Sequence, residues 1–149
     1  MIYVAVVGPG NAQAAHESAA EEVGRLIAER RAILVCGGLG GVMEAACRGA
    51  RAAEGVTVGL LAGTERDDAN AYVSVALPTG LGQARNAVVV RSADSVVAIG
   101  GGYGTLSEIA LALKAGKRVV GLDSWDIDGV VAVADPDAAV AAVLGESLT

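Results

Sequence analysis

Residues 95–108 have the sequence Ser-Val-Val-Ala-Ile-Gly-Gly-Gly-Tyr-Gly-Thr-Leu-Ser-Glu and join an apolar run to a glycine-rich loop and the start of a helix. The first five residues are typical of a buried strand. Thr105 begins a segment with helical patterning that extends to Lys114. A glycine loop between a strand and a helix exposes backbone N–H groups without intrahelical acceptors, and the helix dipole adds partial positive charge. The stretch therefore predicts an anion-binding loop, followed one turn later by the carboxylate of Glu108.

Segments of strand and helix character alternate along the whole chain. Most of the strand-like segments are continuous runs rich in Val and Ile, as in parallel strands covered on both faces. Such alternation predicts a doubly wound, Rossmann-like α/β sheet, and 149 residues suit a single domain over residues 1–149. The expected strands are 2–7, 32–36, 56–61, 74–77, 95–99 and 118–122, and the expected helices are 12–30, 42–53, 83–92, 105–115 and 137–144.

Glycine-bearing loops follow four of the expected strands, at residues 8–11, 37–41, 79–82 and 100–104. In a doubly wound sheet the ligand crevice lies at the carboxyl ends of the strands, so these loops are expected to converge on one edge. The residues expected to bind phosphate or nucleotide there are Gly8, Gly10, Asn11, Gly37, Gly38, Gly40, Gly41, Thr79, Asn86, Gly101, Gly102, Tyr103, Gly104 and Thr105.

Two common nucleotide-binding motifs are absent. The dinucleotide fingerprint requires a third glycine after Gly8-x-Gly10 and an acidic residue at the end of the second strand, but the chain has Gln13 and Cys36-Gly37 at those places. A Walker P-loop requires Gly-Lys-Ser/Thr, which does not occur in the chain. The sequence therefore favours neither a standard NAD site nor ATP-driven phosphoryl transfer.

Two charged residues on the predicted edge are candidates for chemistry. Arg85 follows a glycine-containing turn near a helix start, where a guanidinium can bind phosphate or carboxylate with two N–H groups; the alternative is a surface ion pair. Glu108 also has two interpretations. It can close a capping box with Thr105, or it can hold a carboxylate beside a bound ligand, and the two roles can coexist.

Composition limits the partners of the chain. The formal net charge is −6, the basic residues are scattered, and three Tyr and one Trp are the only aromatic residues, so nucleic-acid binding is not expected. No apolar stretch reaches the roughly 18 residues of a membrane helix, and no basic segment precedes the first strand, which favours a cytoplasmic protein without a signal peptide. Cys36 and Cys47 are expected to be buried thiols, His16 to be solvated or to cap a helix, and no metal or resident cofactor is expected.

Residues 100–108 resemble the P-G-G-x-G-T-x-x-E motif of the Lonely Guy (LOG) family of Rossmann-like proteins, phosphoribohydrolases long labelled as lysine decarboxylases. Residues 37–43 are similar to the second glycine loop of that family, G-G-G-x-x-G-L-M, and Arg85 falls at the arginine of its M-x-E-R-K segment. The chain departs from the family at Gly100, which replaces proline, and at residues 82–86, which keep only the arginine. In residues 8–10 and 100–102 it is closer to a sister branch that includes the molybdenum cofactor carrier proteins.

The resemblance implies two classes of function. In the first, the protein hydrolyses the N-glycosidic bond of a nucleoside 5′-monophosphate; Glu108 stabilises an oxocarbenium-like sugar or orients water, and Arg85 positions the substrate or assists the leaving base. In the alternative, the site carries a phosphate-bearing cofactor such as molybdopterin, or senses a nucleotide, without breaking a bond. The retained Arg85 and Glu108 favour the hydrolase, which is the first expectation, and the missing M-x-E-R-K residues favour the carrier. The resemblance also implies a homodimer or a higher homo-oligomer.

Overall fold

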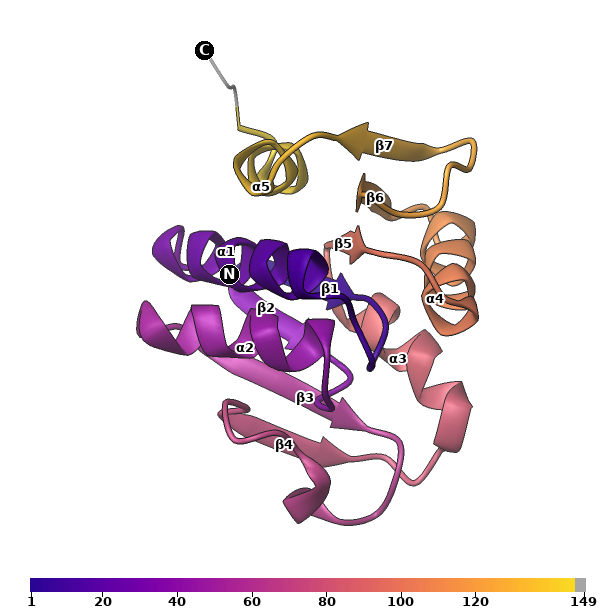
Figure 1. Ribbon diagram of the computed structural model, residues 1–149. Coiled ribbons are helices and arrows are strands. Elements are labelled where there is room, and N and C mark those ends of the chain that lie inside the picture. Colours follow the sequence, from indigo (N-terminus) through magenta and orange to yellow (C-terminus); the bar gives the residue numbers. More distant parts are fainter. Residues whose placement is uncertain (147–149) are drawn as a thin grey trace.

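The computed structural model describes residues 1–146 and contains one seven-stranded sheet in which every pairing is parallel (Figure 1). The last three residues of the expected 1–149 domain lie outside the described residues. The strands stand in the order β4-β3-β2-β1-β5-β6-β7. Their bounds are β1 Tyr3–Val7, β2 Ile33–Cys36, β3 Thr57–Leu61, β4 Val75–Pro78, β5 Ser95–Ile99, β6 Arg118–Leu122 and β7 Val130–Val133.

The order of the strands reverses in the middle of the sheet. From β1 the chain builds outward through β2, β3 and β4, and it then returns to the other side of β1 with β5, β6 and β7. The junction of β1 and β5 is therefore a topological switch point, where the loops after the two strands diverge and leave a crevice. The loops that leave these two strands are residues 8–13 and 100–102.

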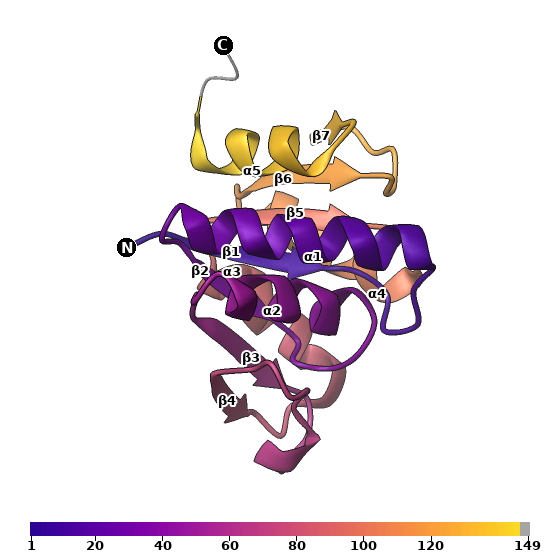
Figure 2. The ribbon, with the colours of Figure 1, turned by 60° about the vertical axis from the view of Figure 1, so that its left-hand side comes forward.

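Within residues 1–146, five α-helices cover the two faces of the sheet (Figure 2). Successive residues of a strand point to opposite faces, so Val4 and Val6 pack under α1, α2 and α5, whereas Ala5 and Val7 pack under α3 and α4. Each face thus has its own apolar core, as expected for parallel strands with helices on both sides. The helices are α1 Ala14–Glu29, α2 Val42–Ala52, α3 Arg85–Ser92, α4 Tyr103–Lys114 and α5 Pro136–Leu144.

Helices α1 and α2 touch through two glycines. A Cβ atom on Gly24 would lie 1.9 Å from the carbonyl oxygen of Ala46, and one on Gly49 would lie 1.8 Å from that of Glu21. Neither distance is compatible with a side chain, so the two backbones approach each other only because both residues are glycine.

The predicted doubly wound fold is confirmed, and most element bounds agree within two residues. Helix α4 begins at Tyr103 rather than at Thr105, and a 3₁₀ turn at Gly82–Ala84 precedes α3. Strand β7 was not expected. It follows β6 after a crossover, residues 123–129, that contains no helix.

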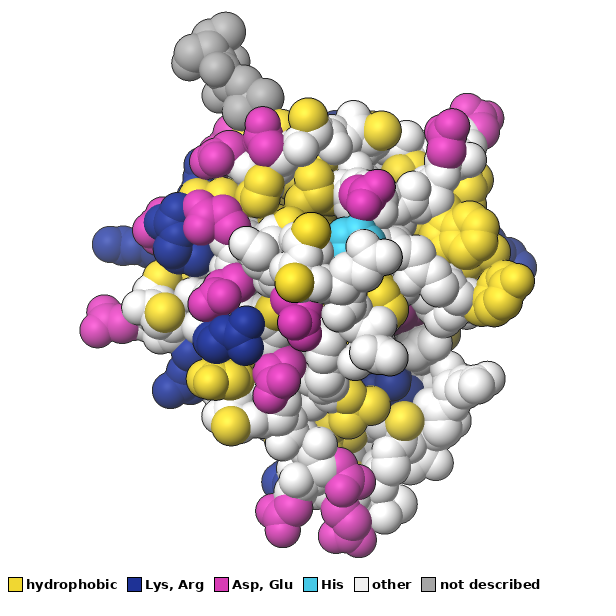
Figure 3. Space-filling view, in the orientation of Figure 1, with side chains coloured by type: hydrophobic (Ala, Val, Ile, Leu, Met, Phe, Trp, Pro, Cys, Tyr) yellow, Lys and Arg dark blue, Asp and Glu magenta, His cyan; other side chains and the backbone are white. Residues whose placement is uncertain are grey.

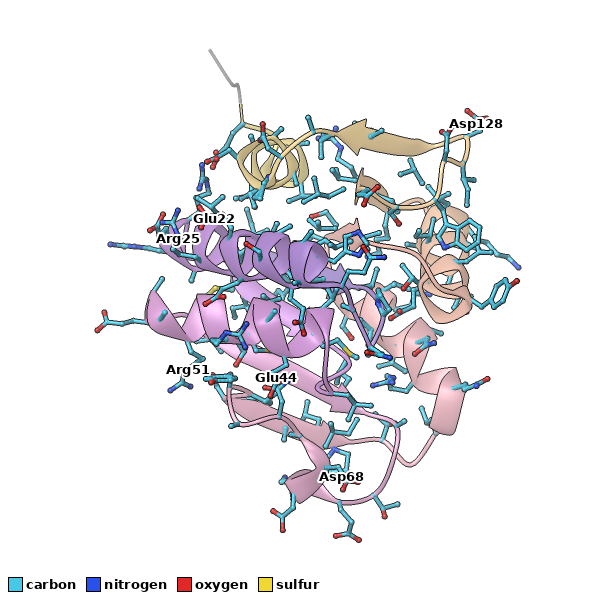
Figure 4. All side chains as sticks on the ribbon, viewed as in Figure 1. Glu22, Arg25, Glu44, Arg51, Asp68 and Asp128 are labelled. Atoms are coloured by element: carbon cyan, nitrogen blue, oxygen red, sulfur yellow. The ribbon has the colours of Figure 1, made fainter. Side chains whose placement is uncertain are left out.

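Charged side chains gather on the helical layer formed by α1 and α2 (Figure 3). Glu22 and Arg25 project from the C-terminal half of α1, away from the glycine loops (Figure 4). They form an ion pair in which Arg25 Nε donates to Glu22 Oε2 at 3.0 Å.

None of the helices in residues 1–146 has the length and apolar character to cross a membrane.

Candidate functional site

A cavity of about 260 Å³ lies at the switch point between β1 and β5. Glycine loops form most of its wall, and Arg85 and Glu108 are the two charged residues that line it. Strand topology therefore brings together residues that are up to 100 positions apart in the chain. The lining residues are Gly8, Pro9, Gly10, Gly37, Met43, Arg85, Asn86, Gly102, Gly104, Thr105 and Glu108.

The start of α4 is open toward ligands. Gly102 is its N-cap, with φ 111°, a conformation that favours glycine, and no side chain caps this helix end. The first N–H groups of a helix have no intrahelical acceptor, so those of the first turn are free to bind an anion. A Cβ on Gly104 would meet nothing within 4 Å, so the chain itself leaves this surface uncovered.

The capping-box interpretation of Thr105 and Glu108 is wrong. Thr105 is the third residue of α4 and is buried, so it does not occupy the N-cap. Among the described residues no hydrogen bond links the Glu108 carboxylate to the helix start. Glu108 instead lines the cavity.

The second glycine loop packs against the first. The N–H of Val42 donates to the carbonyl oxygen of Pro9 at 3.1 Å, so the first N–H group of α2 already has an acceptor. A Cβ on Gly41 would lie 2.3 Å from the Pro9 carbonyl oxygen, and one on Gly40 would lie 3.3 Å from that of Gly10. Gly40 and Gly41 therefore permit close contact between the two loops, and they do not line the cavity.

Arg85 is a buried cation rather than part of a surface ion pair. Its Nη1 group donates to the carbonyl oxygens of Gly37 at 2.6 Å and Leu60 at 2.8 Å, and its Nε group donates to Asn86 Oδ1 at 3.1 Å. Only 9% of the residue is exposed. Within residues 1–146, Nη2 has no hydrogen-bond partner and Arg85 forms no salt bridge. The guanidinium thus supplies positive charge to the cavity while two backbone carbonyls hold it in place.

Glu108 is only partly exposed, and its carboxyl is easily protonated. Burial raises the pKa of Glu108 to about 7, because desolvation disfavours the charged form; the positive charge of Arg85 lowers it and partly offsets this effect. At neutral pH the group is therefore divided between a carboxylic acid, which can donate a hydrogen bond, and a carboxylate.

The other predicted binding residues lie at or beyond the rim of the cavity. Gly101 is exposed in the loop that precedes α4, Tyr103 is exposed as the first residue of that helix, and Asn11 is exposed after β1. Gly38 packs against β3, where a Cβ would lie 2.7 Å from Leu61 Cδ2. Thr79 supports its own loop, since its hydroxyl donates to the carbonyl oxygen of Leu61 at 2.7 Å.

Sequence reasoning missed a second cluster beside the glycine loop. His16 Nε2 donates to Asp123 Oδ2 at 2.7 Å, and the indole Nε1 of Trp125 donates to the carbonyl oxygen of Gly102 at 3.0 Å. Asp123 follows β6 with φ 51°, a left-handed conformation that is uncommon outside glycine. A usable signal was present, because Asp123 directly follows a correctly predicted strand and must lie at the same edge of the sheet.

Cys36 and Cys47 are buried free thiols, as expected, but they lie closer together than the sequence suggested, with Sγ atoms 3.5 Å apart. The pKa of Cys47 is raised because its thiol is hydrogen-bonded to the Cys36 sulfur and because it is buried. In the described part of the chain no group of His, Cys, Asp and Glu side chains could hold a metal ion.

Taken together, the cavity offers the open N–H groups at the start of α4, the buried cation of Arg85 and the protonatable carboxyl of Glu108.

Comparison with known proteins finds relatives over nearly the full length of the chain. An uncharacterised protein of Archaeoglobus fulgidus is 43% identical over 122 residues, which cover 82% of this chain and 80% of the relative. The molybdenum cofactor binding protein of the phototrophic bacterium Rippkaea orientalis matches with a TM-score of 0.92 and 37% identity, over 97% of this chain and 96% of that one. The Moco carrier protein of Chlamydomonas reinhardtii matches with a TM-score of 0.87 and 38% identity, over the same fractions. Residues 1–144 match the SLOG cluster4 family, and the chain therefore belongs to it.

Proposed function

We propose that this protein binds and carries a phosphate-bearing pterin cofactor of the molybdenum cofactor type. The observation that carries the proposal is the cavity at the switch point, where the uncapped start of α4 faces the buried guanidinium of Arg85. Similarity over 97% of the chain to a molybdenum cofactor binding protein and to a Moco carrier protein supports the choice of ligand.

The chemistry of the lining suits a phosphate monoester. Its oxygens accept hydrogen bonds from the N–H groups of the first turn of α4, and the helix dipole favours their charge. Arg85 Nη2, free of other partners among the described residues, is available for a charge-assisted bond to the same phosphate. Glu108 accommodates the added negative charge because its pKa of about 7 lets the carboxyl take up a proton near neutral pH. The cofactor is cargo in this proposal, so no bond is broken at the site.

Cofactor retention tests the proposal. The protein is incubated without oxygen with molybdenum cofactor released from a molybdoenzyme and then separated by gel filtration. Molybdenum and the fluorescence of the oxidised pterin are measured in the protein fraction. We expect molybdenum and pterin to elute with the wild-type protein in equimolar amounts.

The variant Gly104→Ala supplies the matched loss of function. Its methyl group enters open space, so the fold is preserved, but it occupies the surface that receives the phosphate. Loss of one or two charge-assisted hydrogen bonds corresponds to at least about tenfold weaker retention. Ser107→Ala, an exposed change on the same helix, is expected to retain the cofactor like the wild type. Failure of the wild-type protein to retain either molybdenum or pterin would refute the proposal.

A second candidate is hydrolysis of the N-glycosidic bond of a nucleoside 5′-monophosphate. The pairing of Glu108, with a pKa near 7, and Arg85 in one cavity favours it, because an acid poised at neutral pH suits proton transfer to or from a reacting group. Incubation with AMP, an N6-substituted AMP and CMP, followed by chromatography of free base, tests this reaction. Base released by the wild type but not by Glu108→Gln would establish it, and release by neither would leave the carrier proposal standing alone.

Homo-oligomer formation remains a prediction from the resemblance to the LOG family. Light scattering on the purified protein measures its mass in solution against the 14.7 kDa of one chain.

A further inference from the structure

Two of the four aromatic residues in the chain lie together at the mouth of the phosphate site. The rings of Tyr103 and Trp125 are stacked, with centroids 6.3 Å apart and an interplanar angle of 28°. Tyr103 is the first residue of α4, between Gly102 and Gly104, and both of these neighbours line the cavity. We propose that these rings, here called the aromatic platform, bind the planar heterocycle of a ligand whose phosphate occupies the start of α4.

Trp125 is fixed relative to the phosphate-binding loop. Its indole N–H donates to the carbonyl oxygen of Gly102, the N-cap of α4, at 3.0 Å. Its ring also packs against the apolar core under α3 and α4. The indole therefore forms the rigid side of the platform, at a constant distance from the open N–H groups.

Tyr103 has no comparable structural role. The residue is 85% exposed, and among the described residues its hydroxyl makes no hydrogen bond. Apolar side chains at the surface over α4 are visible at the edge of the molecule in Figure 3. A large ring held in solvent beside an anion site adds little to folding, but it offers a flat apolar surface to a ligand. Stacking of a nucleobase on an aromatic side chain contributes measurably to affinity and requires no particular base.

The inference rests on the proposed function, since it assumes that a phosphate-bearing ligand occupies the cavity. It adds the place where the rest of that ligand binds: the platform takes a fused bicyclic heterocycle, a pterin or equally a purine, that is joined to the phosphate by a short linker. A sugar phosphate without a ring system would use the loop alone. The glycine loop thus binds the charged phosphate of the ligand, and the aromatic platform binds its planar ring.

A pair of probes separates the two parts. Guanosine 5′-monophosphate and ribose 5-phosphate share the phosphate and the sugar, and guanine carries the same amino-oxo-pyrimidine ring edge as a pterin. We expect calorimetric titration to show that wild-type protein binds the nucleotide about tenfold more tightly than the sugar phosphate. Trp125 is the only tryptophan, so quenching of its fluorescence reports contact with the platform. The nucleotide should quench it, and ribose 5-phosphate should not.

Substitutions at Tyr103 complete the test. Tyr103→Leu removes the ring but keeps an apolar side chain, and it should abolish the preference for the nucleotide while leaving the affinity for ribose 5-phosphate unchanged. Tyr103→Phe keeps the ring and should behave like the wild type. An unchanged preference in Tyr103→Leu, or equal wild-type affinities for the two probes, would overturn the platform while phosphate binding stands. Failure of ribose 5-phosphate to bind would count instead against the phosphate site, and with it against the proposed function.

Discussion

Arg85 Nη1 lies 2.6 Å from the carbonyl oxygen of Gly37, and this contact places the guanidinium in the wall of the cavity. The contact requires glycine at position 37, because a Cβ there would lie 2.6 Å from the same Nη1 atom. Buried arginines usually pair with a carboxylate, but here the acceptors are neutral: two backbone carbonyls at the ends of β2 and β3 and the side-chain oxygen of Asn86. The positive charge is therefore held in place without being neutralised, which suits a site for an anion.

Arg85→Ala is predicted to destabilise the fold as well as to weaken anion binding. The substitution leaves the carbonyl oxygens of Gly37 and Leu60 buried without their donor, at a cost of about 1–3 kcal/mol each. Urea unfolding should therefore show a loss of about 2–5 kcal/mol with an unchanged slope against denaturant concentration. Arg91→Ala is the matched control, an exposed arginine on the same helix, and should change the free energy of unfolding by less than about 0.5 kcal/mol. Equal effects of the two substitutions would contradict the structural role of Arg85.

Gly24→Ala tests the contact between α1 and α2. In an open helix, alanine is favoured over glycine by about 1 kcal/mol. Here the new methyl group would lie 1.9 Å from the carbonyl oxygen of Ala46, so the helices must separate. We expect a net loss of about 2–3 kcal/mol in the free energy of unfolding. Ser18→Ala, at an exposed position of α1, is the control and should be neutral or slightly stabilising. A stabilised Gly24→Ala protein would show that the two helices are not in contact.

Much of the fold could be predicted because its signals are local. The apolar run 95–99 and the glycines after it identify a strand and a helix start without reference to the rest of the chain. Strand β7 lacks such signals. It has four residues, two of them exposed, and it reaches parallel register with β6 after a seven-residue crossover, where a dozen or more residues are usual. Its stability comes from pairing with β6, which a single stretch of sequence does not reveal.

The location of the candidate site was also predictable, but its inner arrangement was not. The rule that ligands bind at the carboxyl ends of strands was enough to bring Gly8, Gly102 and Glu108 to one edge. The burial of Arg85 depends on carbonyl acceptors 48 and 25 positions away in the sequence. The packing role of Gly41 likewise depends on a contact with Pro9 in another loop. Neither contact can be inferred from the spacing of residues in the sequence.

Glu108→Gln is predicted to stabilise the protein at alkaline pH. The pKa of Glu108 is about 7 in the folded chain and near its ordinary value of 4.5 in the unfolded chain, so the folded state holds this proton more tightly. The stability that this difference contributes is present at low pH and is lost as pH rises through 7. A neutral amide should therefore raise the free energy of unfolding at pH 8.5 by up to about 3 kcal/mol and leave it unchanged at pH 4.

Thermal or urea unfolding across this pH range measures the effect. Glu65→Gln, on an exposed loop, is the control and should show no such pH dependence. Equal stability of Glu108→Gln and the wild type at pH 8.5 would mean that the Glu108 carboxyl ionises without cost.

The same carboxyl is predicted to make anion binding depend on pH. Sulfate is a suitable probe, because it remains a dianion between pH 5 and pH 9, whereas phosphate changes its own charge. As pH rises through 7, Glu108 ionises and repels the bound anion, so sulfate affinity should fall about tenfold between pH 6 and pH 8.5. Isothermal titration at several pH values measures this fall.

Two variants assign the dependence to its source. Glu108→Gln should bind sulfate with nearly constant affinity over the range. Histidine also changes charge between pH 5 and pH 8, and His16 lies beside the glycine loop, where a Cβ on Gly100 would be 3.0 Å from its Nδ1 atom. His16→Gln should therefore retain most of the pH dependence if Glu108 is the controlling group. A flat profile in His16→Gln, together with a steep one in Glu108→Gln, would transfer that role to the histidine. The pH dependence would then report on the His16–Asp123 pair rather than on the carboxyl in the cavity.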